Sequence, residues 1–415
     1  MDHVMITAGF KLKMGENPEL DHLFEEYRQM VNELLQVCAE KGITSLSKLH
    51  REKYHELREK YPDLNSMYIC DAMRMALGIY SNFRKRQRRG KTKVDKPVFK
   101  KNAILLHRRL FKLDLNSWRF MLTIGEGKRI GANLYHSSYH LKFRDMRQRE
   151  AYLVKRNNGY FLNVSFIRDV ELREPNGKVL AIDLNENNIT FGGKDITQIE
   201  TGERTIRTTY YLKRKRIWKK LQLGDYVRFG TPIPEKAKKL LEKYRRRQTR
   251  RVLALYHKIA NKIVEKAKEM DASVVVMENL KHMEKMWRRE KNLKNPKKKL
   301  PKELRGRLNR WSFRKFQQII EYKAKLAGLN VVYVNPKGTS SMCPVCGVKL
   351  SPNGHRVLKC PRCGYENDRD VVAVLNLMRR YTEDVGSFPK GDLSTPKAPV
   401  KPEMVKGNPS GGDAG

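Results

Sequence analysis

Apolar and polar residues alternate at the start of the chain, and this period of two predicts a half-buried strand. The apolar or small positions are Ile6, Ala8, Phe10, Leu12 and Met14. From Pro18 the apolar spacing changes to three and four residues, which predicts a helix that ends at Gly42. Two more helical patterns follow, one that reaches Pro62 and one over residues 65–89. The sequence therefore predicts one strand followed by a unit of three helices.

Alternation returns between residues 97 and 172, most clearly at Tyr160, Leu162, Val164 and Phe166. The simplest arrangement is a small β-barrel that the first strand begins, the helices interrupt, and this segment completes. Several rings lie here among Lys and Arg: Trp118, Phe120, Tyr135 and Tyr139. Such rings can stack on bases, but rings in a barrel are more often part of its core. We therefore expect most of them to be buried.

In the second half of the chain, predicted strands and helices alternate, which is typical of an α/β domain. A buried strand over 179–182 ends at Asp183, and a short strand follows at 189–192. A Lys- and Arg-rich segment leads into a long helix at 235–270, and a third strand at 273–277 ends at Glu278. A helix over 311–327 and a strand over 331–334 complete the pattern.

The charge of the chain narrows the class of partner. Its 415 residues suffice for two or three domains, and they contain 87 Lys and Arg against 45 Asp and Glu, a net charge of +42. A polyanion would neutralise this excess, so a nucleic acid is the favoured partner and a membrane surface the weaker alternative. Two dense cationic runs stand out. Runs such as 83–93 are usually solvated surface, although this one lies where helices give way to strands, and 294–310 is expected to be a flexible loop or an RNA contact.

The sequence predicts neither a membrane-spanning helix nor, in residues 1–14, a signal peptide. No apolar run reaches the roughly 20 residues needed to span a bilayer, and residues 1–14 lack the apolar core of a signal peptide. Of the six cysteines, Cys38 and Cys70 fall in helical apolar patterns, which favours small core residues over a disulfide. We therefore expect no membrane partner and a reducing, cytoplasmic or nuclear location.

Four cysteines near the C-terminus form two C-x-x-C knuckles, each followed by a glycine. They are Cys343, Cys346, Cys360 and Cys363. The glycine permits the left-handed turn that lets both thiolates of a knuckle face one point. Four thiolates at about 2.3 Å satisfy tetrahedral Zn²⁺ and leave no open position, which is typical of a structural site. Two disulfides or free core cysteines are the alternative reading, but this spacing favours zinc.

Three carboxylates stand where strands end or a helix begins. Asp183 and Glu278 each end a buried strand, and Asp370 opens the final apolar helix. Each alone has a plain explanation, as a strand end facing water or a helix cap. Together they suit two divalent cations that hold a scissile phosphate, because such ions need several converging carboxylates. Asp368 is a rival to Asp370 as the third ligand.

Four segments of the chain resemble the TnpB family, the transposon-encoded RNA-guided nucleases related to type V CRISPR effectors. They are KVLAIDLNENNITFGG, ASVVVMENLK, the run from WSFRKFQQII to SSMCPVCG, and CPRCGYENDRDVVAVLNL. The resemblance covers the C-terminal half and implies an RNase H-like (RuvC) nuclease domain with an inserted four-cysteine zinc ribbon. It also implies a preceding wedge barrel split by a helical recognition insertion, so the fold class is α/β multidomain.

The resemblance further implies cofactors, partners and a division into domains. Asp183, Glu278 and Asp370 would bind catalytic Mg²⁺ or Mn²⁺, and the four cysteines structural Zn²⁺. The partners would be a guide RNA from the transposon end and double-stranded target DNA beside a short motif, with the oligomeric state left open. The expected parts are wedge strand 1–15, recognition insertion 16–91, wedge remainder 92–177, RuvC-like domain 178–338, zinc ribbon 339–367, final RuvC helix 368–381 and disordered tail 382–415.

Two positions depart from the family pattern. Asn185 replaces the glycine that usually follows the Asp-Leu of the first motif, and asparagine also tolerates a left-handed turn. Val372 replaces the asparagine of the third motif, which leaves the metal ligands but puts the turnover rate in doubt.

The leading hypothesis is an RNA-guided, metal-dependent DNA endonuclease that hydrolyses phosphodiesters with two metal ions. A guided DNA-binding regulator without cleavage is one alternative, although all three carboxylates are present. A compact type V effector is another, and a transposase proper is less favoured because no other acidic or tyrosine constellation stands out.

Overall fold

A computed structural model describes residues 2–92, 94–280, 302–308, 310–385 and 403–404 of the chain. The chain divides into two compact units, and each is described by itself. The N-terminal unit comprises His3–Asp169, and the C-terminal unit comprises Val170 onward together with Asp2.

The N-terminal unit contains a seven-stranded sheet in the order β2-β6-β7-β1-β5-β4-β3. Its strands are β1 (Asp2–Lys13), β2 (Ala103–Leu106), β3 (Phe111–Asp114), β4 (Arg119–Thr123), β5 (Arg129–Tyr135), β6 (Arg147–Arg156) and β7 (Gly159–Val170). The first strand therefore lies inside a sheet whose other members come after the helices, as the sequence pattern predicts. Short turns of helix, η1 (Arg108–Leu110) and α4 (Ser138–Leu141), connect some strands. The closure of this sheet into a barrel stays a prediction.

Three helices are inserted between β1 and β2, and they are α1 (Pro18–Lys41), α2 (Leu46–Lys60) and α3 (Met67–Arg88). The Asn17 side chain accepts a hydrogen bond from the Leu20 N–H (2.9 Å), and Gly42 ends α1 at φ +65°. These are the start and stop signals that the sequence carries. Cys38 is buried on α1 and Cys70 half-buried on α3, both as free thiols.

The aromatic residues of this unit divide between core and surface. Phe120 is buried with Phe10 and Phe166, as expected. The expectation is wrong for Tyr135 and Tyr139, whose side chains are more than half exposed. Lysine ammonium groups cover their rings, those of Lys11 and Lys13 lying over Tyr135. Cation–π contacts of this kind let a ring remain at the surface.

Asp71 on α3 has no exposed surface, and its carboxylate accepts the His107 N–H at 2.6 Å. Burial raises its pKa to about 6. A carboxyl whose pKa is raised in the folded state costs stability as the pH rises from 4 through 6, because ionisation is easier in the unfolded chain.

We expect Asp71→Asn, which keeps an oxygen for the His107 N–H, to stabilise α3 at pH 7 by about 1–3 kcal/mol and have little effect at pH 4. Hydrogen exchange of α3 peptides at the two pH values measures this, with the exposed Glu59→Gln variant as control. Equal protection of wild type and Asp71→Asn at pH 7 would contradict it.

The C-terminal unit is built on a six-stranded sheet in the order β12-β11-β8-β9-β10-β16. The strands are β8 (Val179–Leu184), β9 (Asn188–Gly192), β10 (Ile196–Glu200), β11 (Val274–Glu278), β12 (Asn330–Val334) and β16 (Glu403–Met404). Strands β8, β9 and β10 form an antiparallel meander, whereas β11 and β12 run parallel to β8. Helical connections join β10 to β11 and β11 to β12, as parallel strands require.

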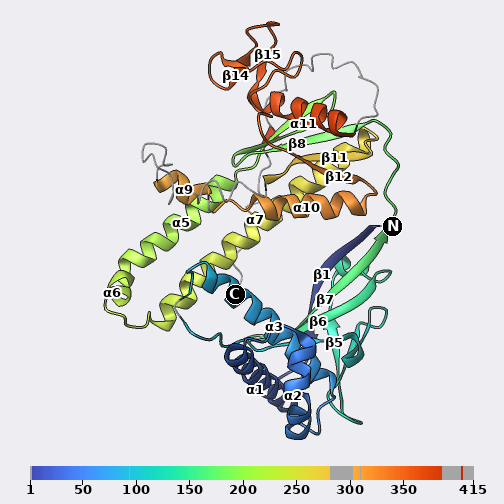
Figure 1. Ribbon diagram of the computed structural model, residues 1–415, viewed down its shortest axis with the longest axis vertical. Helices are drawn as coiled ribbons and strands as arrows, with labels where there is room; N and C mark the ends of the chain where they lie inside the picture. Colours follow the sequence, from blue (N-terminus) through green and yellow to red (C-terminus); the bar gives the residue numbers. More distant parts are fainter. Residues whose placement is uncertain (1, 93, 281–301, 309, 386–402, 405–415) are drawn as a thin grey trace. The chain divides into compact units, whose positions relative to one another are not determined.

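Helices cover both faces of this sheet (Figure 1). Side chains of α7 (Glu235–Glu269) and α10 (Phe313–Leu326) pack with Leu180 and Ile182 of β8 on one face. On the other face α11 (Arg369–Val385) packs with Ala181. A strand with helices on both sides has apolar residues at successive positions, and this explains the run Val179–Ile182.

A helical arm precedes α7 and was missed by the sequence analysis. It consists of α5 (Glu203–Lys220) and α6 (Leu223–Arg228), which lead back through α7 to the sheet. Glu203 is buried at the base of the arm, where its carboxylate accepts hydrogen bonds from Arg207 (2.5 Å) and Tyr256 (2.7 Å). This charged contact fixes α5 on α7.

Three further expectations, for the cationic segment 294–310, the final helix and the tail, agree with the structure only in part. Most of the cationic segment 294–310 lies outside the described residues, but Lys302–Leu308 is helix α9 rather than loop. The final helix continues to Val385, beyond the expected limit at residue 381. Of the tail expected to be disordered, Glu403–Met404 forms β16 beside β10, and residues 386–402 and 405–415 lie outside the described part.

Candidate active site

Strand β8 carries Asp183 at its carboxyl end, where only 7% of the residue is exposed. The parallel neighbour β11 pairs Met277 with Ile182, so Glu278 lies level with Asp183 on the adjoining strand. The structure thus places both predicted carboxylates at the same edge of two neighbouring strands, as parallel pairing dictates.

Glu278 is held by neighbouring side chains, one of them from the start of the four-cysteine ribbon. The Thr339 hydroxyl donates to its Oε1 at 2.6 Å, and the Gln317 amide donates to its backbone oxygen at 2.8 Å. The Asn376 amide of α11 donates to the Thr339 carbonyl oxygen at 2.7 Å. Glu278 is therefore connected by hydrogen bonds to both the final helix and the ribbon.

Asp370 lies in the first turn of α11 and is 4% exposed. The Asn185 amide nitrogen donates to Asp183 Oδ2 at 2.7 Å and to Asp370 Oδ1 at 3.2 Å. One nitrogen atom therefore contacts both carboxylates, although they stand far apart in the sequence. Asn188 and Gln198 donate to Asp370 Oδ2 at 2.6 and 3.1 Å.

A cation from the ribbon also contacts Asp370. The Arg356 guanidinium forms an ion pair with the Asp370 carboxylate and lies 3.5 Å from Asp368 Oδ2. Asp368 itself accepts the Asp370 N–H at 2.8 Å, so this rival for the third ligand position caps the start of α11.

Burial raises the pKa of all three carboxyl groups. At Asp183 the pKa lies well above its usual range, because of burial first and then the negative charges of Glu278 and Asp370. The Asn188 amide and Arg356 oppose the rise at Asp370, and the Thr339 hydroxyl opposes it at Glu278. Buried carboxylates that repel one another are a donor set for a cation, whose charge would favour their ionised forms.

The four cysteines of the ribbon lie together. Cys343 Sγ is 3.6 Å from Cys363 Sγ, Cys346 Sγ is 3.4 Å from Cys360 Sγ, and all four sulfurs lie within 4.8 Å of one another. Sulfurs at the corners of a tetrahedron with bonds of about 2.3 Å lie roughly 3.8 Å apart, so one Zn²⁺ fits this set. In the described part of the chain, the three carboxylates are not gathered about one point in this way.

Both knuckles have the same backbone geometry. Gly347 and Gly364 adopt φ +73° and +72°, which confirms the predicted left-handed turns. Their N–H groups donate to the carbonyl oxygens of Cys343 and Cys360, the first cysteines of the two knuckles. Short strands β13 (Ser351–Pro352), β14 (Val357–Lys359) and β15 (Glu366–Asp368) connect the knuckles to α11.

The sequence analysis missed several residues that contact the carboxylates. Asn188 lies in the LNENN turn, but Gln198 lies on β10, whose polar sequence ITQIE carries no strand pattern. Asn185 has a negative φ, so its role lies in its side chain and the suggested left-handed turn is wrong. Arg356 resembles any other surface cation in the sequence, and only the fold places it on Asp370.

Comparisons with known proteins place this chain near TnpB-like and Cas12f1-like proteins. The family model described as "Cas12f1-like, TNB domain" matches residues 313–377, and that of the uncharacterized protein MJ0013 family matches 23–121. The TnpB-like protein MJ0751 of Methanocaldococcus jannaschii is 40% identical over 228 residues, 53% of this chain and 74% of that protein. The CRISPR-associated endodeoxyribonuclease Cas12f1 of Sulfoacidibacillus thermotolerans is 40% identical over 72 residues, 17% of each chain.

A solved structure shares the fold. The Cas12f1 chain of a Cas12f1–sgRNA–target DNA complex aligns with a TM-score of 0.57 at 15% identity, covering 87% of this chain and 83% of that one. Fold and sites together define an α/β protein with buried carboxylates beside a four-cysteine ribbon. Because the chain is 40% identical to MJ0751 over 74% of that protein, it belongs to the TnpB-like family. This family is related to the type V effectors. Among the described helices none is long and apolar enough to cross a membrane.

Proposed function

We propose that the chain is an RNA-guided, metal-dependent endonuclease that cuts double-stranded DNA beside a short motif. The observation that carries the proposal is the convergence of Asp183 and Asp370 on the Asn185 amide, with Glu278 level with Asp183 on the next strand. The three carboxylates come from separate elements, two of them buried and Glu278 half-buried. Such a set suits divalent cations, because a cation offsets the cost of bringing several negative charges together away from water.

Asp183, Glu278 and Asp370 would hold Mg²⁺ or Mn²⁺, which prefer carboxylate oxygens. Bound there, two such ions would supply an activated water and charge stabilisation at the leaving oxygen of a phosphodiester. The amides of Asn185, Asn188 and Gln198 orient the Asp370 carboxylate, and Thr339 orients that of Glu278. The surrounding helices exclude bulk water from Asp183.

The expected domains belong to the same proposal. Residues 178–338 and 368–381 would be the RuvC-like nuclease, supported by the strand order of the sheet and the carboxylates at its strand ends. Residues 1–15 and 92–177 would be the wedge, and 16–91 the recognition insertion. The net charge of +42 supports guide RNA and target DNA as partners, as in the Cas12f1 complex with the same fold.

The test is to sequence RNA that co-purifies with the protein and to supply a matched plasmid with Mg²⁺. Guided cutting that follows a changed guide supports the proposal. Binding without cutting favours the second candidate, a guided DNA-binding regulator. Two observations favour that candidate: Arg356 neutralises Asp370, and Val372 replaces the usual asparagine.

RNA binding should weaken steeply with salt, because each neutralised phosphate releases counterions. We expect the affinity to fall by a factor on the order of 10³ or more between 50 and 200 mM salt if six or more phosphates are contacted. Filter binding over this range measures the slope. An affinity that does not change with salt would contradict an electrostatic role for the cationic surface.

A further inference from the structure

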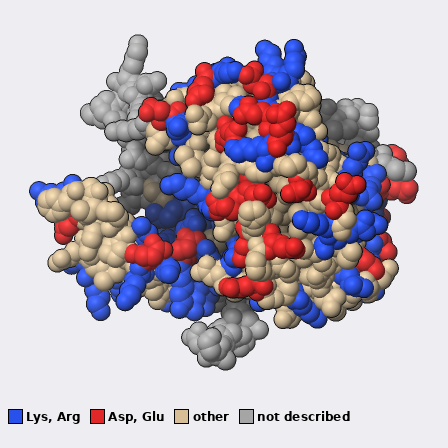
Figure 2. Space-filling view, turned by 90° about the horizontal axis from the view of Figure 1, so that it is seen from below, with Lys and Arg blue, Asp and Glu red and all other residues tan. Residues whose placement is uncertain are grey.

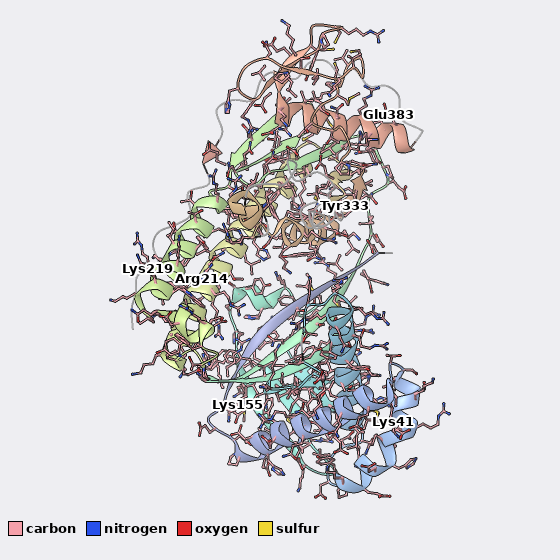
Figure 3. The ribbon with its side chains drawn as sticks, turned by 60° about the vertical axis from the view of Figure 1, so that its left-hand side comes forward. Lys41, Lys155, Arg214, Lys219, Tyr333 and Glu383 are labelled. Atoms are coloured by element: carbon pink, nitrogen blue, oxygen red, sulfur yellow. The ribbon has the colours of Figure 1, made fainter. Side chains whose placement is uncertain are left out.

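The helical arm carries a groove between α5 and α7 with a volume of about 550 Å³. Sites for small ligands range over roughly 300–1,000 Å³, so the groove suits one base or a ring of similar size. Two rings and two cations of α5 line it together with side chains of α7, and the lining includes Tyr211, Arg214, Lys215, Trp218, Lys238 and Leu241. Figure 3 labels Arg214 and Lys219 on this arm.

The rings of the groove are available to a ligand. Trp218 and Tyr211 are each 40% exposed, which is unusual for large rings that could pack on a neighbouring helix. The Arg310 guanidinium lies 4.7 Å from the centre of the Tyr211 ring. In contrast, Tyr210 on the preceding position of α5 is buried against α7. The helix thus keeps one ring for packing and leaves two outside.

The charge around the groove is mostly positive, although Lys238 of the lining lies 3.8 Å from the exposed carboxylate of Glu235. Helix α5 contains eight Lys or Arg and one acidic residue, Glu203, which is already paired with Arg207. Glu242, the acidic residue of the lining, is paired with Arg245 and Arg246. Lys and Arg gather along the edge of the arm, the lobe at the left of Figure 2. Among the described residues that line the groove, no carboxylate is therefore left without a cationic partner.

The lowered pKa of Arg214 is further evidence that cations are crowded at the groove. Its guanidinium donates to the Gln248 amide oxygen at 2.7 Å, which orients it without neutralising it. Burial lowers its pKa from the ordinary value, and the positive charges of Arg310 and Arg245 lower it further. A phosphate at this place would relieve the repulsion.

We infer that this groove binds an unpaired base of a single-stranded nucleic acid. The base stacks on Trp218 or Tyr211, and Arg214, Lys215 and Lys238 hold the phosphates beside it. Exposed rings with a cationic rim are how proteins grip single strands without reading sequence. The inference rests on the proposed function only for the source of the strand, and it holds whether or not the chain cleaves.

Neither a second copy of this chain nor a nucleic-acid duplex suits the groove as well as a single strand does. A second copy of this chain would bring the same positive arm, and the two would repel each other. The paired bases of a duplex present no free face for stacking, so the groove fits a looped or displaced strand. The apolar tip of the arm, where Phe229 is 71% exposed, lies outside the lining and serves as an internal control.

The experiment uses the full chain with Asp183→Ala, so that cleavage plays no part. Labelled oligo-dT and the same oligonucleotide with abasic sites are titrated at about 0.3 M salt, which screens the remaining positive surface. We expect Trp218→Ala to weaken oligo-dT binding about tenfold, Trp218→Phe to retain most of it, and the abasic strand to be unaffected by either change.

Oligo-dT that carries 5-iododeoxyuridine should also crosslink under ultraviolet light to Trp218 or Tyr211, as mass spectrometry of the peptides would show. If Trp218→Ala weakened the binding of oligo-dT and of the abasic strand equally, the stacking role would be overturned. The groove would then bind nucleic acid through its charge alone. Loss of a dimer in Trp218→Ala but not in Phe229→Ala would assign the groove to a second copy of the chain and overturn the inference. Failure of guided cleavage in the wild-type chain, with the base-dependent binding intact, would sink only the proposed function.

Discussion

Replacing Asp183 with Ala should abolish guided DNA cleavage and leave guided DNA binding nearly unchanged. The carboxylate is buried, shares the Asn185 amide with Asp370, and lies level with Glu278, so its loss removes a central ligand of the proposed metal site. We expect the cleavage rate to fall by a factor on the order of 10³–10⁴, as for other groups that act as a unit in catalysis. Plasmid cleavage and target binding, measured on one protein preparation, separate the two effects.

The stability of the variant distinguishes lost chemistry from lost folding. Burial and neighbouring charges hold the pKa of Asp183 well above its usual range, so this carboxyl group destabilises the metal-free fold once the pH exceeds about 4, the ordinary pKa of an aspartate. In the presence of a chelator, the melting temperature of Asp183→Ala should therefore be no lower than that of the wild-type protein. Asp195→Ala, which removes an exposed carboxylate from the turn between β9 and β10, is the matched control and should cut normally. A wild-type chain that binds its target but never cuts would favour the regulator.

Replacing Cys360 with Ser should remove zinc and unfold the ribbon. Purified wild-type protein should contain about one zinc per chain, and the variant close to none, because structural zinc contributes directly to folding. Strand β15 leads from the ribbon into α11, and Thr339 joins the ribbon to Glu278. We therefore expect guided cleavage to be lost as well, although no zinc ligand belongs to the carboxylate site.

Metal analysis, with hydrogen exchange of residues 339–370, measures both parts of this expectation. Cys70→Ser, which changes a half-buried free thiol on α3, is the control and should keep its zinc. Freshly purified, unchelated wild type without zinc would rule out the zinc site.

The sequence predicts those parts of the fold whose cause is local. Pro18 and Gly42 bound a helix through backbone preferences, and the buried strands at 179–182 and 274–277 show as apolar runs. The arm is different, because α5 is charged on many positions and buries little, so its periodicity is weak. The contacts of Asp370 with Asn188, Gln198 and Arg356 join distant segments, and no local pattern announces them.

The place of α11 in the chain order, after the strands β8 and β11 that it covers, bears on how the protein is made. This helix covers one face of β8 and β11 and carries Asp370, so synthesis of the sheet precedes its cover. At roughly 5–20 residues per second, about 10–40 s pass between the emergence of Leu184 and that of Arg369. During that interval the face of β8 and β11 that α11 buries in the folded protein has no helix to cover it. A chain that stops before residue 370 lacks the third carboxylate, so it would lack one of the three ligands of the proposed metal site.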